Sequence, residues 1–198
     1  MGGRKNERTV GRLTVRFTAD LHLGHKNIIK YCSRPFDNVA KMNKAIIRNL
    51  NVGVSDNDLM YILGDNALTK NPDILNLLHD IRGRKILILG NHDNQIPQED
   101  WIDKYGFESV HDYYIAYHNE QIFIMAHDPV DTLFLARRIG SNMNPVLLNG
   151  HVHNLCPYSV DNQTGNFSIN VGLDVNSLKP MDIGDVMERQ WRFEEELC

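Results

Sequence analysis

Apolar and polar positions alternate along the 198-residue chain in patterns that predict strands and helices in turn. Residues 12–19 place apolar side chains at every second position, which is typical of a strand with one buried face. Residues 38–50 repeat their apolar side chains near helical spacing, and either Asp37 or Asn38 is a candidate N-cap for that helix. The chain therefore begins with a strand that is followed by a helix.

Further apolar runs continue this order toward the C-terminus. Residues 58–65 and 84–94 predict two more strands, and Asn71 with Pro72 is expected to begin a helix over residues 73–81. The second half predicts, in order, a hairpin over residues 110–129 that turns at Asn119 and Glu120, a helix over residues 129–139, and strands over residues 144–154 and 166–174. This order predicts an α/β chain with layered sheets.

Candidate catalytic and metal-binding residues occur where the apolar strands end. Five strand ends carry them, in the order Asp20-Leu21-His22, Gly64-Asp65, Gly90-Asn91-His92-Asp93, Ala126-His127 and Gly150-His151-Val152-His153. A polar residue at one strand end is more often a cap or turn residue than a ligand, and one pair such as His151 and His153 decides little. Five such ends in order are hard to explain as caps, and in α/β folds ligands bind beyond the carboxyl ends of strands. The pattern therefore indicates one shared site.

Composition narrows the class of protein. Hydrophobic residues make up 42% of the chain, as in an ordinary globular protein, and no apolar run approaches the roughly 20 residues that span a bilayer. The polar N-terminus and three widely spaced cysteines lead us to expect a cytoplasmic protein. We expect a flexible tail over residues 1–10 and a single domain over residues 11–198. The net charge of −4, without a basic stripe, argues against an extended nucleic-acid surface.

The motif series D-x-H, G-D, G-N-H-D, H and G-H-x-H resembles that of the calcineurin-like metallophosphoesterase superfamily and spans residues 12–175. The segments DLHLGHKNIIKYCSRPF and NVGLDVNSLKP make the chain similar to a small group of bacterial and phage phosphoesterases that have no cap domain. The resemblance implies a four-layer αββα sandwich, in which two packed mixed β-sheets are flanked by helices. It also implies two metal ions at one edge of the sheets.

The resemblance assigns a role to each motif residue. The first metal would be held by Asp20, His22 and His153. The second metal would be held by Asn91, His127 and His151, and Asp65 would bridge the two. His92 would face the substrate as a general acid or phosphate-binding group, steadied by Asp93. Mixed nitrogen and oxygen ligands favour transition metals, so we expect manganese first, with iron, zinc or nickel as alternatives. Hydrolysis would proceed by in-line attack of a hydroxide that bridges the two metals.

Residues outside the metal motifs leave alternatives open. His25 either contacts a substrate phosphate or begins a helix, and Arg34 either binds a phosphate oxygen bidentately or is merely solvated. We favour the substrate contact for Arg34 because its loop follows the first metal motif. Asp128 departs from the usual fourth motif and adds a carboxylate near the second metal, but we expect it to pair with Arg137 or Arg138.

The combined pattern predicts a metal-dependent phosphoric ester hydrolase. A phosphodiester or nucleotide-type substrate is our first expectation, because relatives without a cap domain often cleave diesters. A phosphomonoesterase is the close alternative. A nuclease needs a longer basic groove, and a catalytically silent binding scaffold would have lost ligands that are all present in this chain. We expect a small phosphate ester or nucleotide as the partner and no membrane, and the oligomeric state stays open.

Overall fold

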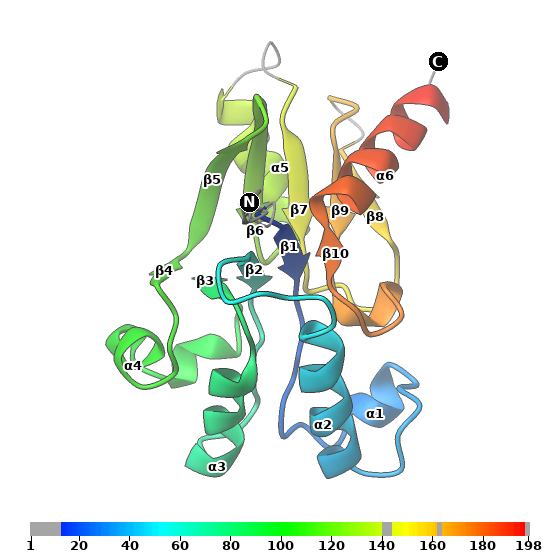
Figure 1. Cartoon of the computed structure of the whole chain (residues 1–198). Helices are drawn as coiled ribbons and strands as arrows, with labels where there is room; N and C mark the ends of the chain where they lie inside the picture. The colour runs from blue at the N-terminus through cyan, green and yellow to red at the C-terminus, as the bar shows by residue number, and fades with distance from the viewer. Residues whose placement is uncertain (1–12, 140–143, 162–163, 197–198) are drawn as a thin grey trace, which may run out of the picture.

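The computed structural model describes residues 13–139, 144–161 and 164–196, so the tail predicted over residues 1–10 lies outside the described residues. This part of the chain forms two five-stranded mixed sheets. The sheets pack face to face, and helices cover their outer faces (Figure 1). The arrangement confirms the predicted four-layer αββα sandwich.

Each sheet places parallel strands at its centre. In spatial order, the first sheet consists of β10 (Met181–Asp182), β1 (Val15–Thr18), β2 (Leu59–Leu63), β3 (Arg84–Ile88) and β4 (Ser109–His111). In spatial order, the second consists of β5 (Tyr113–His118), β6 (Gln121–Ala126), β7 (Val146–Asn149), β9 (Phe167–Asn170) and β8 (Tyr158–Val160). Strands β1 to β4 are parallel, as are β6, β7 and β9, while β10, β5 and β8 run antiparallel to their neighbours.

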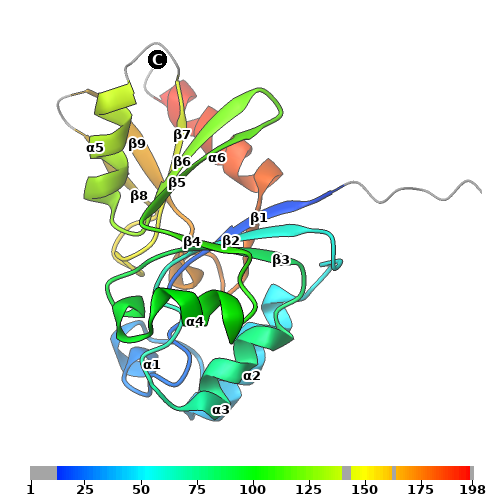
Figure 2. The same cartoon turned by 90° about the vertical axis from the view of Figure 1, so that its left-hand side faces the viewer.

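Helices form the outer layers. The α-helices of the described residues are α1 (Ile28–Tyr31), α2 (Val39–Leu50), α3 (Pro72–Leu75), α4 (Gln98–Asp103), α5 (Pro129–Ile139) and α6 (Ile183–Glu196). Short 3₁₀ helices are η1 (Asn76–Asp80), η2 (Asp93–Gln95) and η4 (Leu173–Val175). Figure 2 shows α1 to α4 on the side of the first sheet, and α5 and α6 on the side of the second. Among these helices, none combines the length and the apolar character needed to cross a membrane.

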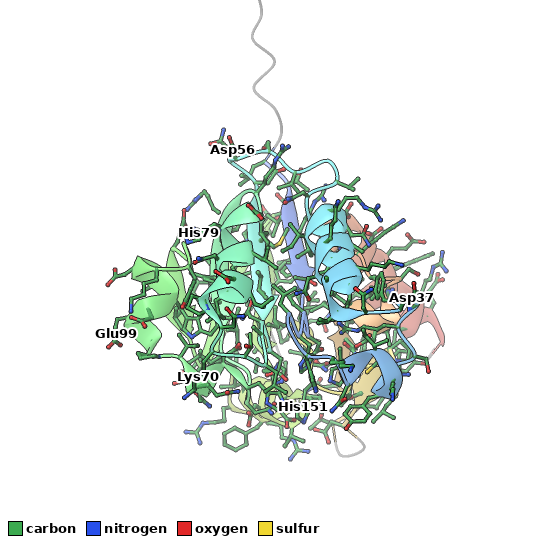
Figure 3. All side chains as sticks on the ribbon, turned by 90° about the horizontal axis from the view of Figure 1, so that it is seen from below. Asp37, Asp56, Lys70, His79, Glu99 and His151 are labelled. Carbon is green, nitrogen blue, oxygen red and sulfur yellow. The ribbon has the colours of Figure 1, made fainter. Side chains whose placement is uncertain are left out.

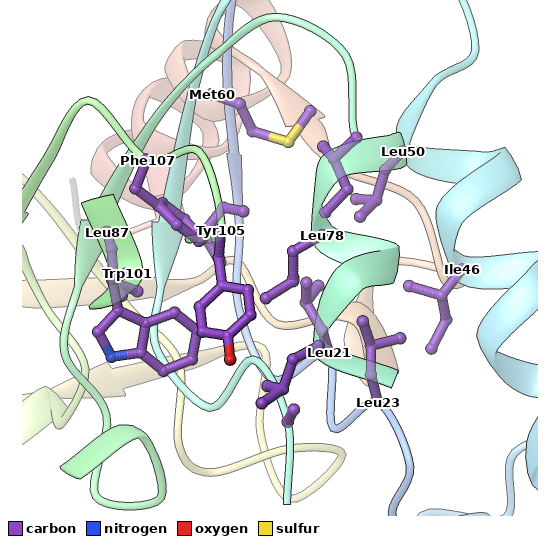
Figure 4. Close-up of a cluster of buried hydrophobic side chains, with 14 of the residues drawn as sticks. Leu21, Leu23, Ile46, Leu50, Met60, Leu78, Leu87, Trp101, Tyr105 and Phe107 are labelled. Atoms are coloured by element: carbon purple, nitrogen blue, oxygen red, sulfur yellow. The ribbon is translucent and has the colours of Figure 1, made fainter. Parts of the chain in front are cut away.

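One hydrophobic core lies between the first sheet and its helices. Met60 of β2 packs there with Ile46 of α2 and Trp101 of α4 (Figure 4). Ile62 of β2 belongs to the same core, and each of the four side chains is at most 1% exposed. Burying a side chain of this size contributes about 1.5–3 kcal/mol. The core holds the helices against the sheet and so keeps the loops at its edge in place.

A second core fills the space between the two sheets. Phe17 of β1 stacks on Tyr61 of β2, with ring centroids 5.5 Å apart, and on Phe123 of β6, with centroids 5.6 Å apart. Tyr61 and Leu63 face this core, whereas Met60 and Ile62 between them face the helices. Because β2 is buried on both faces, its sequence LMYIL is apolar throughout. This packing sets the distance between loops that belong to different sheets.

The predicted helix starts are confirmed. The Asn38 side chain accepts a hydrogen bond of 2.9 Å from the backbone N–H of Lys41, so Asn38 is the N-cap of α2. The Asn71 side chain accepts one of 3.0 Å from the backbone N–H of Asp73 at the start of α3. The helix predicted over residues 73–81 is α3 followed by η1, because its last turn tightens to 3₁₀ geometry.

Other boundaries differ from the predictions. The hairpin of β5 and β6 turns at Asn119 and Glu120 as predicted, and both residues have positive φ angles, of 49° and 67°. The predicted hairpin began too early, because residues 110 and 111 belong to β4, which pairs with β3 of the first sheet. The short elements α1, β8 and β10 were not predicted, because two to four residues are too few to show a period. Helix α6 was also missed, although Ile183, Val186 and Met187 recur at helical spacing in its sequence.

Candidate metal centre

The predicted ligands follow parallel strands in both sheets. Asp20, Asp65 and Asn91 lie beyond the carboxyl ends of β1, β2 and β3, while His127 and His151 lie beyond those of β6 and β7. In Figure 3, His151 lies at the edge of the molecule opposite Asp56, which precedes β2. The two sheets therefore present their ligands at one common edge.

The predicted ligands of the second metal lie close together. His127 Nε2 is 3.1 Å from Asn91 Oδ1 and 3.2 Å from His151 Nδ1. Donor atoms that share one metal at about 2.0–2.2 Å have separations of this size. The carbonyl oxygen of Leu63 lies 2.7 Å from His127 Nδ1, so Nδ1 carries the proton and Nε2 is left to bind a cation.

Asp65 lies between the two ligand sets. Its Oδ2 is 3.5 Å from Nε2 of His22, a predicted ligand of the first metal, and 3.5 Å from Nε2 of His127, a predicted ligand of the second. Its Oδ1 accepts a hydrogen bond of 2.9 Å from the backbone N–H of His92. One carboxylate oxygen thus faces both positions, as the predicted bridging role requires.

Asp20, His22 and His153 form the first position, and their donor atoms all lie within 4.8 Å of one another. The rings of His22 and His153 have centroids 4.9 Å apart. Both ring nitrogens of His22 are buried, and neither has a hydrogen-bond partner among the described residues. An unpaired buried polar atom is costly, and a cation beside it would remove that cost. The donor sets of both positions therefore fit divalent transition metals.

Several of the predicted metal ligands have a strained backbone conformation that sets the direction of their side chains. Five of the predicted ligands have positive φ angles, namely Asp20 (59°), His22 (50°), Asp65 (56°), His151 (70°) and His153 (47°). Residues other than glycine rarely adopt this conformation, and each instance costs on the order of 1–3 kcal/mol. The strain turns the chain sharply where each strand ends, and it persists because the packed sheets hold these ends in place.

Two glycines allow the ends of β2 and β3 to touch. A Cβ atom on Gly64, where φ is +80°, would lie 2.5 Å from the backbone nitrogen of Gly90. A Cβ atom on Gly90 would lie 2.4 Å from Asp65 Oδ1. Any side chain at either position would therefore displace the Asp65 carboxylate or the strand beside it.

Comparison with known proteins decides the family. The family model described as calcineurin-like phosphoesterase matches residues 13–179, which is most of the chain. This chain belongs to the calcineurin-like phosphoesterase family. It is accordingly a metal-dependent phosphoric ester hydrolase, in agreement with the ligand sets described above.

Relatives of this phosphoesterase include proteins without an assigned activity. An uncharacterized protein of Methanocaldococcus jannaschii is 35% identical over 173 residues, which cover 85% of this chain and 86% of that protein. The crystal structure of a protein of unknown function from Aquifex aeolicus is 26% identical with a TM-score of 0.70, over 89% of this chain and 98% of that one. A solved archaeal phosphodiesterase, 14% identical with a TM-score of 0.50, covers 86% of this chain and 99% of its own and shares the fold.

Burial sets the pKa values of the most enclosed ligands of this phosphoesterase. Burial raises the pKa of the Asp20 carboxyl to about 6, against the lowering effect of His127 and His153. Burial lowers the pKa of His22 to about 3, against the raising effect of Asp65. A His22 that is neutral at pH 7 keeps a ring nitrogen available for a cation.

The pKa of Asp65 is lowered and that of His127 is raised, because each side chain stabilises the charge of the other. Burial raises the pKa of Asp65, but the interaction with His127 outweighs it and holds the value at about 2. Burial lowers the pKa of His127, but Asp65 and Asp20 raise it to about 9. A cation bound at this place would take over the role of the proton on His127.

His92 faces the centre, but Asp93 does not steady it as predicted. The His92 side chain is 37% exposed, and its Nε2 lies 3.9 Å from Asp65 Oδ2. The buried Asp93 carboxylate instead accepts hydrogen bonds from the backbone N–H groups of Asp65 (2.8 Å), Asn66 (3.0 Å) and Gly90 (2.9 Å). Asp93 therefore orders the turn that carries Asp65, because backbone amides rather than the imidazole of His92 donate to its carboxylate.

Arg34 is buried, which corrects the prediction that it binds a substrate phosphate. Its side chain is 1% exposed, and all five N–H groups of its guanidinium have acceptors. The acceptors are the carboxylate of Asp174, the carbonyl oxygens of Asp20 and Leu21, and the sulfur of Met42. No donor of Arg34 remains for a phosphate oxygen.

Asp174, which was not predicted as a site residue, contacts a predicted metal ligand. It follows β9 within η4, and its Oδ2 lies 2.8 Å from Nδ1 of the predicted ligand His153. Burial raises its pKa, but His153 and Arg34 lower the value to about 2, so the carboxylate is charged. A signal was present, since Asp174 follows an apolar strand just as the other candidate residues do.

His25 lies at the rim of the centre. Its ring is 5.4 Å from that of His22 between centroids, and its Nδ1 is buried without a hydrogen-bond partner among the residues that the structure describes. The exposed ring of Tyr31 contacts it edge-on, with centroids 6.2 Å apart. Both alternatives for His25 fit this place, since it precedes α1 and also borders the ligands, so its contact with substrate stays a prediction.

Asp128 does not pair with Arg137 or Arg138 as predicted. Its Oδ2 lies 3.8 Å from His151 Nε2, at the rim of the second position. Arg137 instead binds Asp161, with distances of 2.7 and 2.6 Å. Asp128 directly precedes α5, whereas Arg137 and Arg138 are in its last turn. The two arginines are therefore about 12 Å or more along the helix axis from Asp128.

Cys32 is not a convincing metal ligand. Its sulfur lies within 4.8 Å of donor atoms of His153 and Asp174. However, the guanidinium of Arg34 already binds both oxygens of that carboxylate and would repel a cation. Burial and the charge of Asp174 raise the pKa of the Cys32 thiol to about 12, so the thiol stays protonated. Of the two groups that contain His153, the one with Asp20 and His22 therefore fits a metal ion, and the one with Cys32 and Asp174 does not.

Proposed function

We propose that this phosphoesterase is a dinuclear-metal-dependent phosphodiesterase that acts on a small or nucleotide-type diester. The observation that carries the proposal is the place of Asp65 Oδ2, which lies 3.5 Å from a histidine nitrogen of each ligand set. A carboxylate so placed can bridge two cations about 3.5–4 Å apart, the spacing used for in-line displacement at phosphorus. When bound, such cations would polarise the phosphate oxygens and lower the pKa of a water molecule.

The charges around the centre favour a diester over a monoester. A diester carries one negative charge, whereas a monoester carries up to two near neutral pH. Arg34 is buried and cannot supply a cation for the second charge. Beside the second position lies an open depression of about 300 Å³, which is lined in part by the carboxylates of Asp112, Asp128 and Asp131. These groups would repel a dianion more strongly than a monoanion.

An exposed aromatic ring supports a substrate with a flat organic group. Tyr31 is 69% exposed, and its ring meets the edge of His25 beside the first position. Stacking of a nucleobase on such a ring contributes about 1–3 kcal/mol. We therefore include nucleotide-type diesters in the proposed substrate class. Manganese as the native cation and a cytoplasmic location are further parts of the proposal.

His92 would supply the proton in this reaction. Its ring is accessible from solvent, and its backbone N–H is held by the bridging carboxylate, so the ring overlooks the space between the two positions. An imidazolium in that place can donate its proton to a departing alkoxide, which contributes about 10²–10⁴-fold to the rate. His92→Ala should therefore lose about that factor in kcat on a diester with a poor leaving group and keep both cations.

Hydrolysis of bis(p-nitrophenyl) phosphate and of p-nitrophenyl phosphate with Mn²⁺ tests the proposal. We expect turnover of the diester well above that of the Asp65→Asn variant, and slower turnover of the monoester. Turnover of the monoester alone would refute the proposal and indicate a phosphomonoesterase instead.

Exposed His79, far from His151 in Figure 3, offers a matched control for His92. His79→Ala should keep wild-type turnover, whereas full activity of His92→Ala on a methyl or alkyl diester would refute the assigned proton transfer. Bound Mn²⁺ in both variants, measured by atomic emission, separates loss of the proton donor from loss of the metals.

A further inference from the structure

Two segments separated by 140 residues meet in a buried ion pair behind the first metal position. Arg34 Nε and Nη2 donate hydrogen bonds to Asp174 Oδ1 and Oδ2 at 2.7 and 3.0 Å, and each side chain is 1% exposed. Moving two charges out of water is costly, so a buried pair is by itself weak support for a role in stability. A different role for this pair follows from its further contacts.

Asp174 links the pair to a predicted metal ligand. Its Oδ2 lies 2.8 Å from His153 Nδ1, so the carboxylate accepts the Nδ1 proton and leaves Nε2 for a cation. The same contact orients the ring toward His22, whose centroid is 4.9 Å away. A carboxylate behind a metal-binding histidine fixes its tautomer and increases its basicity.

Arg34 also holds the turn of a second ligand in the same position. Its Nη2 and Nη1 donate hydrogen bonds to the carbonyl oxygens of Asp20 and Leu21, at 2.7 and 3.0 Å. Asp20 is strained, with a φ angle of 59°, and these bonds offset part of that cost because they satisfy two buried carbonyls. One guanidinium thus controls the direction of Asp20 directly and that of His153 through Asp174.

The second position is supported differently within the described part of the chain. His127 Nδ1 is bound to a neutral group, the carbonyl of Leu63, at 2.7 Å. The exposed His151 has a carboxylate oxygen of Asp128 3.8 Å from its Nε2, beyond hydrogen-bond distance. A buried charged pair therefore supports only the first of the two positions.

We propose that Arg34 and Asp174 are positioning residues that set the metal affinity of the first position. The inference rests on the proposed dinuclear centre, and neither side chain touches the substrate. Loss of the pair weakens the binding of one cation by about 10–100-fold, the usual effect of a partner behind a metal ligand, and spares the other cation. The segments CSRPF and VGLDV are in this sense one functional unit.

Asp174→Asn tests the proposal, with Asp161→Asn as a matched control. Asp161 likewise accepts two hydrogen bonds from one arginine, Arg137 at the far end of α5, with distances of 2.7 and 2.6 Å. Calorimetric titration with Mn²⁺ should show two cations per chain for the wild type and for Asp161→Asn. In Asp174→Asn, one of the two cations should bind about 10–100-fold more weakly.

Nitrogen NMR of the metal-free protein provides a readout that does not depend on activity. In the wild type, His153 should be protonated at Nδ1, and in Asp174→Asn the Nδ1 and Nε2 tautomers should mix. Arg34→Lys keeps the charge but loses the planar fork, so it should weaken the same cation and leave the variant folded. This variant carries the test if Asp174→Asn does not fold.

Unchanged Mn²⁺ affinities and an unchanged His153 tautomer in a folded Asp174→Asn or Arg34→Lys variant would overturn the positioning role. A wild type that binds a single cation, with that cation weakened in Asp174→Asn, would refute the dinuclear function and uphold the positioning role. A wild type that binds two cations, neither of them bound more weakly in the variants, would support the dinuclear function and refute the positioning role.

Discussion

The two predicted metal positions of this phosphoesterase have similar candidate ligands and different surroundings. In the first, Asp20 and His22 are 0% and 1% exposed, and the ion pair of Arg34 lies behind them. In the second, Asn91 is exposed, and the side chain of His151 is 41% exposed. Aspartate in the one set stands where neutral asparagine stands in the other, so the first position also has the greater negative charge.

The difference shows that neighbouring loops of one fold can form a buried metal position and a solvent-exposed one. The first position lies beside the core under the helices, and its neighbours Leu21, Leu23 and Ile28 are at most 3% exposed. The second opens onto the depression beside Asp128. Burial strengthens electrostatic attraction, so the buried position should hold its cation tightly while the exposed one exchanges it and meets the substrate.

The largest effect is expected from the residue that both positions share. Asp65→Asn removes the negative charge that lies 3.5 Å from a histidine of each set, so both cations should bind weakly. Turnover of bis(p-nitrophenyl) phosphate should fall by more than the roughly 10–100-fold that is typical for partners behind a ligand. Asp161→Asn is the control, and selective loss of only one cation in Asp65→Asn would show that the carboxylate does not bridge.

Removal of the metals should have the next largest effect. At a free cation concentration about 100-fold above its Kd, each bound cation stabilises the folded chain by about 2.7 kcal/mol, which is about 5–10 °C in the melting temperature of a domain of this size. A chelator should therefore lower the melting temperature in two steps as its concentration rises. Scanning calorimetry at graded EDTA concentrations would measure this, and a single step would mean that the two positions do not differ in affinity.

The smallest effect is expected from a change that makes the two positions more alike. Asn91→Asp adds a negative charge next to His127, whose Nε2 is 3.1 Å from Asn91 Oδ1. The Coulomb gain exceeds the added desolvation at this exposed place, so the second Kd for Mn²⁺ should fall about tenfold, or 1.4 kcal/mol. Titration of the wild type and the variant would show it. An unchanged second Kd would indicate that enclosure, rather than ligand charge, separates the positions.

Much of the fold followed from local patterns, because period and caps are local properties. The alternation in β1, the apolar run of β2 and the N-cap at Asn38 each depend on a few neighbouring residues. A shared site for Asp65, His127 and His151 was also predicted, since ligands of α/β folds bind beyond the carboxyl ends of strands. The packing of the two sheets brings Asp65 of the first next to the histidines of the second. Pairings between distant segments did not follow, and Arg34, Asp93 and Asp128 all differ from expectation for that reason.

The sequence by itself determined which residues stand at the strand ends and what chemistry they offer, because strand period, turns and ligand type are written in neighbouring positions. Tertiary structure alone decided that Arg34 turns inward to Asp174, 140 residues away, rather than outward to a phosphate. It also decided that His22 is enclosed while His151 is exposed. The physical reason is that burial and long-range pairing depend on how whole sheets and helices pack, which no short stretch of sequence specifies.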